Sequence, residues 1–311
     1  MGPQAAPSAG RRLSFPPPII IAPTSMHRIT IIVLHGRGQT GEYFHTSLLS
    51  TPAAHSHATN LRDALPHGRF VFPTAPLMRA TKYRRSRIRQ WYDGSGDWEP
   101  EARGNMRESV EHIQALIRDE VRLVGGDASR VILMGFSQGC AMALTSLLLW
   151  EGDALGAVVG MSGFIPLNAH MTDLLGGQDQ GDEGSDVGFV FGSDSSSECG
   201  SVPDDPARGV KSPLQQAIRD LRDEAELPTT STFMSPLSFL QTPVFIGHGT
   251  EDPKVKYVHG HLATRLLEKM GIHTELHTYQ GLGHCLSTDM LGDVLLFLSS
   301  TIDPDNSNQE T

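Results

Sequence analysis

Residues 131–139 read Val-Ile-Leu-Met-Gly-Phe-Ser-Gln-Gly, and this stretch decides the fold. Its apolar start predicts a buried strand, and the apolar residues that follow it predict a helix. Between the two lies a G-x-S-x-G motif with Ser137 at its centre. Gly135 and Gly139 permit a sharp turn that lifts a serine hydroxyl above the edge of a sheet. We therefore predict a nucleophile elbow at Ser137, with an ordinary turn and a helix-capping serine as the alternative.

Strands and helices of the same kinds alternate along most of the chain. Short apolar runs predict strands at 19–22, 29–34, 70–72, 130–134, 155–161, 243–248 and 273–279. We expect the first two of these strands to be buried. Amphipathic or apolar periodicity predicts helices at 105–124, with Asn105 as N-cap, and at 138–150, 257–270 and 286–298. Such alternation is typical of an α/β fold with a mainly parallel, twisted sheet and helices on both faces.

A nucleophilic serine needs a base, and the base needs an orienting carboxylate. In parallel sheets of this kind the chemistry lies beyond the carboxyl ends of the strands, in the chain order serine, acid, histidine. Asp252 follows an apolar strand, and His284 lies in a glycine-flanked loop before the last predicted helix. We predict these two as acid and base, with Glu251 as the competing acid and a turn role as the alternative for Asp252. His248 and His277 follow apolar strand residues and are interpreted as structural.

The loop after the strand at 29–34 is rich in glycine and reads His35-Gly36-Arg37-Gly38-Gln39. A tetrahedral intermediate needs two N–H donors aimed at its oxyanion. We predict the backbone N–H groups of Arg37 and of Gln138, the residue after Ser137, as these donors. An ordinary strand-to-helix loop is the alternative.

Composition and charge exclude several classes of protein. The net charge of −10 argues against general nucleic-acid binding. No run of 18 or more apolar residues occurs, so the sequence predicts no transmembrane helix. The 3 cysteines cannot all pair and are few for a secreted scaffold, which predicts a reducing compartment. Cys140 and Cys285, each close in sequence to a predicted site residue, are interpreted as small packed hydrophobes.

The negative charge is concentrated in one stretch. Residues 171–230 carry 13 Asp or Glu against 4 Lys or Arg, a net charge of −9. We predict one α/β domain over 19–302, interrupted by an acidic low-complexity insertion at about 171–230, with disordered tails at 1–18 and 303–311. Apolar spacing predicts an amphipathic helix at 213–227. We interpret the insertion as a tolerated surface segment, with regulation or partner docking as the alternative.

A basic run lies upstream of the nucleophile motif. Six cations fall within 11 residues, at Arg79, Lys82, Arg84, Arg85, Arg87 and Arg89. We interpret the run as a solvated loop. The alternatives are weak contact with an anionic membrane surface, with an acidic partner, or with the acidic insertion of the same chain.

Six motifs, taken in order, resemble the phospholipase/carboxylesterase family, which includes acyl-protein thioesterases and lysophospholipases. They are L-H-G-R-G-Q-T-G at 34–41, Q-W-Y-D at 90–93, G-F-S-Q-G at 135–139, M-S-G-F-I-P at 161–166, H-G-T-E-D-P-K-V at 248–255 and G-L-G-H at 281–284. The resemblance covers about residues 28–170 and 240–300. It implies an α/β-hydrolase that cleaves thioester or oxyester bonds to acyl chains in the cytoplasm, with no metal and no cofactor.

The resemblance also assigns roles to individual residues. It implies Ser137, Asp252 and His284 as a catalytic triad, with Arg37 and Gln138 as oxyanion donors. Substrate contacts are expected at Gly36, at Phe164 in a stretch that shapes the acyl groove, and at Trp91, placed near the site entrance. The expected partners are an acylated protein or a small ester or thioester, and no nucleic acid.

Departures from the family pattern leave the substrate open. The family often has Asp where Gln39 stands and Gly where Cys140 stands, and its link before the Asp252 strand is usually much shorter. The insertion therefore puts the preferred acyl length in doubt. Rival functions are a small-molecule carboxylesterase or pathway thioesterase, and a binding protein on a catalytically dead hydrolase fold.

Overall fold

The computed structural model of this chain describes residues 13–54, 58–94, 106–176, 212–228 and 237–302. Several predictions fall on residues that are not described: the tail at 303–311, most of the tail at 1–18, the cap Asn105 and most of the acidic stretch. The predicted domain boundaries therefore stay predictions.

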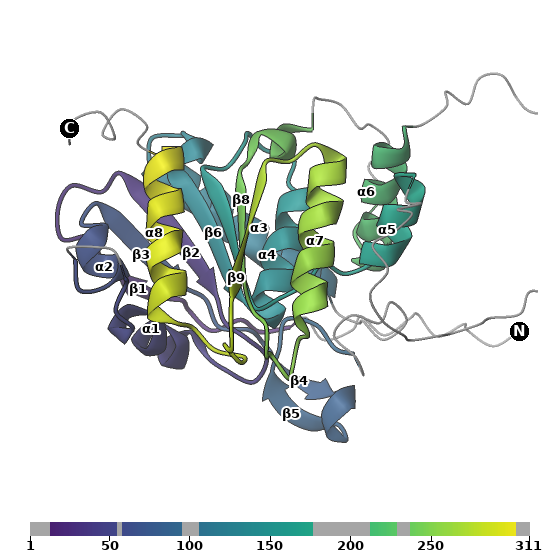
Figure 1. Ribbon diagram of the computed structural model, residues 1–311, viewed down its shortest axis with the longest axis horizontal. Helices are drawn as coiled ribbons and strands as arrows, with labels where there is room; N and C mark the ends of the chain where they lie inside the picture. The colour runs from purple at the N-terminus through teal and green to yellow at the C-terminus, as the bar shows by residue number, and fades with distance from the viewer. Residues whose placement is uncertain (1–12, 55–57, 95–105, 177–211, 229–236, 303–311) are drawn as a thin grey trace, which may run out of the picture.

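Within the described residues, seven strands form one sheet in the order β1-β3-β2-β6-β7-β8-β9 (Figure 1). Six of them run parallel to their neighbours, which confirms the mainly parallel sheet. They are β3 (Gly68–Phe72), β2 (Ile29–Leu34), β6 (Val131–Phe136), β7 (Ala157–Met161), β8 (Val244–Gly249) and β9 (Thr274–Tyr279). Each corresponds to a predicted strand, with shifts of a few residues at the ends.

The first strand, β1 (Ile19–Ile21), departs from the expectation of a buried strand. It pairs antiparallel with β3 at the edge of the sheet, and Ile20 is 45% exposed. A three-residue apolar run gives no periodicity from which to tell an edge strand from a central one. The prediction that this strand is buried is therefore wrong.

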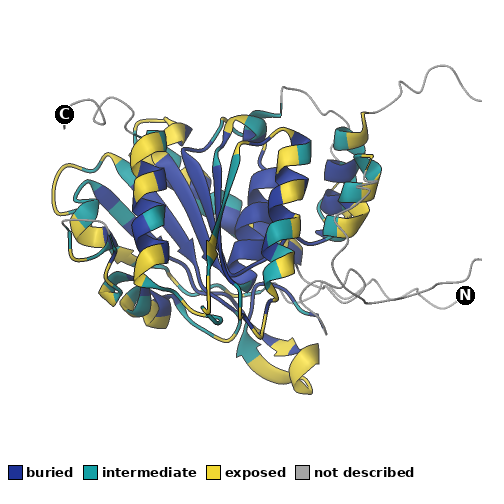
Figure 2. Cartoon of the chain, in the orientation of Figure 1, coloured by how far each residue is buried: buried dark blue, intermediate teal, exposed yellow. Residues whose placement is uncertain are grey.

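Helices cover both faces of the sheet, so that the central strands are buried between them (Figure 2). Alternate side chains of each strand point to opposite faces. Ile32 and Leu133 pack in one apolar layer with α3 (Met106–Leu123), α4 (Gln138–Leu148) and α7 (Tyr257–Met270). Ile31 and Ile132 pack in the other layer with α1 (Gly41–Ser50), α2 (Leu61–Ala64) and α8 (Thr288–Ile302). No helix in the described ranges is both long and apolar enough to cross a membrane.

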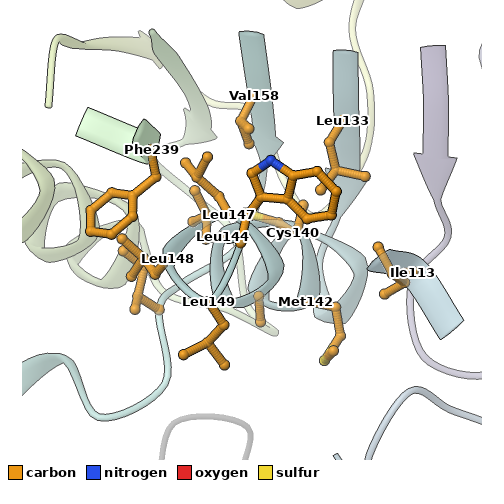
Figure 3. Packing of buried hydrophobic residues seen from close by; sticks show 14 of the residues in the cluster. Ile113, Leu133, Cys140, Met142, Leu144, Leu147, Leu148, Leu149, Val158 and Phe239 are labelled. Carbon is orange, nitrogen blue, oxygen red and sulfur yellow. The ribbon is translucent and has the colours of Figure 1, made fainter. Parts of the chain in front are cut away.

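Helix α4 follows Ser137 and lies in the middle of the larger apolar layer. Every one of its residues is buried. Figure 3 shows its side chains packed between the sheet residues Leu133 and Val158 on one side and Ile113 of α3 and Phe239 of the short turn η4 (Ser238–Gln241) on others. Burial on this scale fixes the start of α4, and with it the position of the serine at its N-terminus.

Three α-helices within the described residues were not predicted. The helix α5 (Asn168–Leu174) is one, and α1 and α2 in the first half of the chain are the others. The predicted helix from Pro213 is present as α6 (Pro213–Glu224), which begins with a capping box formed by Ser212 and Gln215.

The basic run is solvated as expected, but only Lys82, Arg84 and Arg85 lie in the connection between two strands, whereas Arg79, Arg87 and Arg89 lie in the strands themselves. It forms an antiparallel hairpin of β4 (Leu77–Ala80) and β5 (Ser86–Arg89), which projects from the lower edge of the molecule (Figure 1). Five of the six cations are exposed, and Arg89 is half-buried. The apolar alternation typical of strands is weak here, because charged side chains fill the exposed positions of the hairpin.

Candidate active site

Ser137 occupies a strained turn between β6 and α4. Its backbone has φ 56° and ψ −121°, a conformation that non-glycine residues rarely adopt. A Cβ at Gly135 would collide with the carbonyl of Gly139, and one at Gly139 with the carbonyl of Leu34. Ser137 is partly exposed, whereas the residues on both sides of it are buried. The predicted strand–turn–helix is therefore present, and both glycines are required by the close approach of neighbouring backbone.

Asp252 and His284 lie in contact, as the sequence predicts. The His284 Nδ1 donates to Asp252 Oδ2 at 2.6 Å, across the loops that follow β8 and β9. The other oxygen, Oδ1, accepts the backbone N–H groups of Lys254 and Val255 at 2.8 and 2.9 Å. Asp252 thus orients the imidazole and closes its own turn at the same time. Glu251, the competing acid, is exposed.

The Asp252 carboxylate is held in its charged form. Burial raises its pKa, but hydrogen bonds from His248 and His284 and from the backbone N–H of Val255 lower it by more, so that the pKa lies below its ordinary value. An ionised carboxylate on Nδ1 favours the imidazolium that forms when Nε2 takes up a proton.

The imidazole of His284 also lies close to the nucleophile turn. Its ring centroid is 4.8 Å from that of Phe136, the residue directly before Ser137. Its side chain is 8% exposed, so the imidazole is largely shielded from solvent. The sheet thus brings the three predicted triad residues to the carboxyl ends of β6, β8 and β9, at the lower edge in Figure 1.

The glycine-rich loop after β2 lies against the same turn. A Cβ added at Gly36 would lie 3.3 Å from the Cβ of Ser137, so the backbone at Gly36 passes close to the serine side chain. Arg37 is the next residue, and Gln138 begins α4. The residues predicted to carry the two oxyanion donors therefore come from the loop beside Ser137 and from the start of the helix that follows it.

Trp91 and Phe164 are buried in the protein, with 0% and 2% exposure. The expectation that Trp91 lies near the entrance of the site stays a prediction. Its indole Nε1 donates to the carbonyl of His35 at 2.8 Å, and its backbone N–H donates to Gln138 Oε1 at 3.0 Å. Contact of Gly36, Trp91 and Phe164 with substrate stays a prediction.

The two described cysteines differ. Cys140 is buried, and burial raises the pKa of its thiol to about 12 in spite of hydrogen bonds from the backbone at Phe164 and Met161, so it packs as a neutral hydrophobe. Cys285 is exposed, so its interpretation as a packed hydrophobe is wrong. In the described ranges no group of three or more His, Cys, Asp or Glu side chains is arranged to hold a metal ion.

Two buried histidines support the site and were not predicted to do so. His248 was interpreted as structural, and its Nε2 donates to the carbonyl of Val255 at 2.8 Å and lies 3.5 Å from Asp252 Oδ2. His35 contacts the backbone of Gly36, with its Nδ1 2.7 Å from the carbonyl oxygen. Their positions in the sequence motifs could have indicated these roles, because His248 lies four residues before Asp252 and His35 directly precedes Gly36.

Comparison with known proteins gives a family match over most of the chain. The phospholipase/carboxylesterase family model matches residues 16–176 and 224–302, and it omits most of the acidic stretch. Acyl-protein thioesterase 1 of Debaryomyces hansenii is 25% identical, over 88% of this chain and 90% of the relative. Carboxylesterase SOBER1 of Arabidopsis thaliana is 24% identical, over 86% and 87%. The SOBER1 crystal structure superposes with a TM-score of 0.59 at 20% identity, covering 89% of this chain and all of that one.

Proposed function

The chain belongs to the phospholipase/carboxylesterase family of α/β-hydrolases, and from that premise we propose a serine hydrolase that cleaves acyl thioester or ester bonds of acylated proteins or lysophospholipids. The observation that carries the proposal is the 2.6 Å contact between Asp252 and His284, whose ring lies beside the turn that presents Ser137.

In the proposed reaction, the His284 Nε2 removes the proton of Ser137 as Oγ attacks the acyl carbonyl. The backbone N–H groups of Arg37 and Gln138 stabilise the oxyanion of the tetrahedral intermediate. The C–S or C–O bond then breaks, and His284 gives its proton to the leaving thiol or alcohol. Water, with His284 again as base, attacks the acyl-enzyme and releases the carboxylic acid. Asp252 holds the imidazole and stabilises its charged form in both halves.

Two features favour an acylated protein at a membrane surface as the substrate. The relatives include proteins named acyl-protein thioesterase. The hairpin β4–β5, which carries exposed cations, has its base beside the loop after β2, because the backbone carbonyl of Arg89 accepts the N–H of Gly38 at 2.7 Å. Arginine and lysine at this place suit weak contact with anionic lipid headgroups. The free state of the described cysteines, Cys140 and Cys285, suits the reducing cytoplasm as the place of action.

The experiment compares kcat/KM for an S-palmitoylated peptide with kcat/KM for a short p-nitrophenyl ester. We expect the long thioester to be preferred, and to be turned over faster on anionic than on neutral vesicles. Turnover of the short ester alone contradicts protein deacylation. That result favours the second candidate, a small-molecule carboxylesterase, which the carboxylesterase among the relatives supports.

A further inference from the structure

Several backbone groups of the loop after β2 are held by hydrogen bonds. The N–H of Gly36 donates to Gln39 Oε1 at 3.0 Å, and its carbonyl accepts from His35 Nδ1 at 2.7 Å and from the N–H of Gln39 at 3.2 Å. The N–H of Gly38 donates to the backbone carbonyl of Arg89 at 2.7 Å. These hydrogen bonds fix the conformation of the loop. The peptide group between Gly36 and Arg37 is held through the carbonyl oxygen of Gly36.

Fixing that oxygen also fixes the direction of the Arg37 N–H. The carbonyl of Gly36 and the N–H of Arg37 belong to one planar trans peptide and point in opposite directions. We propose that His35 is a positioning residue, which aims the Arg37 N–H at the oxyanion by holding the Gly36 carbonyl with its Nδ1–H. This inference rests on the proposed function, in which Arg37 is an oxyanion donor.

The hydrogen-bond partners of His35 select the tautomer with the proton on Nδ1, which can donate to the Gly36 carbonyl. The carbonyl of Gly36 can only accept, so Nδ1 carries the proton, and Nε2 accepts the backbone N–H of Ala75 at 3.0 Å. The side chain is fully buried. Burial and the charge of Arg89 lower the pKa of His35 to about 4, against the effect of the Gly36 carbonyl, so the ring is neutral at the pH of the cell. A proton on Nε2 would face the Ala75 N–H, donor against donor.

Trp91 joins this loop to the second predicted donor. Its ring lies beside the ring of His35, with centroids 5.1 Å apart, and its Nε1 holds the His35 carbonyl. The side chain of Gln138 accepts the backbone N–H of Trp91 and donates to the carbonyl of Tyr92 at 2.9 Å. Residues 91 and 92 thus tie His35, at the start of the loop after β2, to Gln138 in a buried network, which holds this loop and the start of α4 in place before substrate binds.

Two matched substitutions distinguish the proposed role of His35 in orienting the Arg37 N–H from a role in stability alone. The amide of His35→Asn places a donor near Nδ1, whereas that of His35→Gln places an acceptor near Nε2. We expect His35→Gln to keep its Tm and to lose about 10- to 100-fold in kcat, with KM changed less than about two-fold. We expect His35→Asn to lower Tm, because Ala75 loses its acceptor, and to keep most of kcat.

A trifluoromethyl ketone tests the oxyanion site directly. Ser137 Oγ adds to the ketone carbonyl, the serine proton passes to His284, and the resulting oxyanion occupies the donor site. The inhibition constant should rise in His35→Gln in parallel with the loss of kcat, while the shape of the pH profile of kcat/KM stays that of the wild type. Values within about two-fold of wild type for kcat and for the ketone overturn the inference, and so does an equal loss in both variants.

The wild-type protein provides a test that needs no variant to fold. Nitrogen-15 NMR of the His35 ring should show a neutral imidazole with its proton on Nδ1 from about pH 5 to pH 8, and a proton on Nε2 overturns the inference. Failure of the proposed function gives a different result, because the ketone then does not inhibit the wild-type enzyme at all.

Discussion

Replacing Ser137 with alanine should lower kcat for ester and thioester hydrolysis by roughly 10⁴- to 10⁶-fold, because the proposed mechanism forms the acyl-enzyme on the Ser137 hydroxyl. The loss is in kcat rather than KM, since the hydroxyl acts on the carbonyl and adds little to ground-state binding. The fold is retained, because alanine fits the same turn and α4 remains buried. The measurement is steady-state kinetics on purified protein, with a thermal melt as a check on folding.

Ser299→Ala is the matched control for this variant. Ser299 lies near the carboxyl end of α8, where its hydroxyl donates to the carbonyl of Leu295 within the same helix. Its replacement should leave kcat/KM unchanged. Near-normal activity of pure Ser137→Ala would show that Ser137 is not the nucleophile. Failure of Ser137 to react with a fluorophosphonate would instead favour the alternative of a binding protein on a catalytically dead hydrolase fold.

Replacing Asp252 with asparagine should lower kcat by about 10³- to 10⁴-fold. The amide cannot stabilise the imidazolium of His284, and it can present an N–H to Nδ1 that favours the wrong tautomer. Because the pKa of Asp252 is below its ordinary value, the carboxylate of the wild type is charged throughout the usual assay range. The variant therefore differs from wild type at every assay pH, rather than only at acid pH.

The adjacent acid supplies the control for Asp252. Glu251 is exposed and is the residue that competes for the role in the sequence, so Glu251→Gln should keep kcat within about two-fold of wild type. A larger loss of kcat in Glu251→Gln than in Asp252→Asn would show that Glu251, and not Asp252, is the acid of the triad. Urea unfolding of both variants shows how much of any loss comes from the turn that Asp252 closes through Val255.

The depressed pKa of Asp252 also has a consequence for stability. A carboxyl group whose pKa is lower in the folded than in the unfolded state stabilises the fold above its unfolded pKa, near 3.9. That contribution is lost as the pH falls further, because the folded state must then give up its hydrogen-bonded carboxylate.

The centre of the site was predictable because its signals are local. The apolar strand before Ser137, the two glycines around it and the chain order of Asp252 and His284 each follow from residues close in sequence. Parallel strands place such loops at one edge whatever the rest of the chain does. The structure brings Asp252 to His284 for this reason, with no further information needed.

What could not be predicted depends on contacts between distant residues. The burial of Trp91 follows from hydrogen bonds to His35 and Gln138, 56 and 47 residues away, which no spacing in the sequence indicates. Helix α1 was missed because its apolar residues are few, with only Phe44 and Leu48 among its large side chains buried. The hairpin β4–β5 was missed because cations fill its exposed positions.

The most direct test of the central claim, that Ser137 forms the covalent intermediate, is the location of a trapped adduct. A fluorophosphonate loses fluoride as the serine oxygen bonds to phosphorus, and peptide mass spectrometry then identifies the modified residue. We predict one adduct, on Ser137, formed in proportion to the loss of activity and absent from Ser137→Ala. An enzyme that is inactivated by modification at another residue, or that stays active after Ser137 is fully modified, would contradict the account.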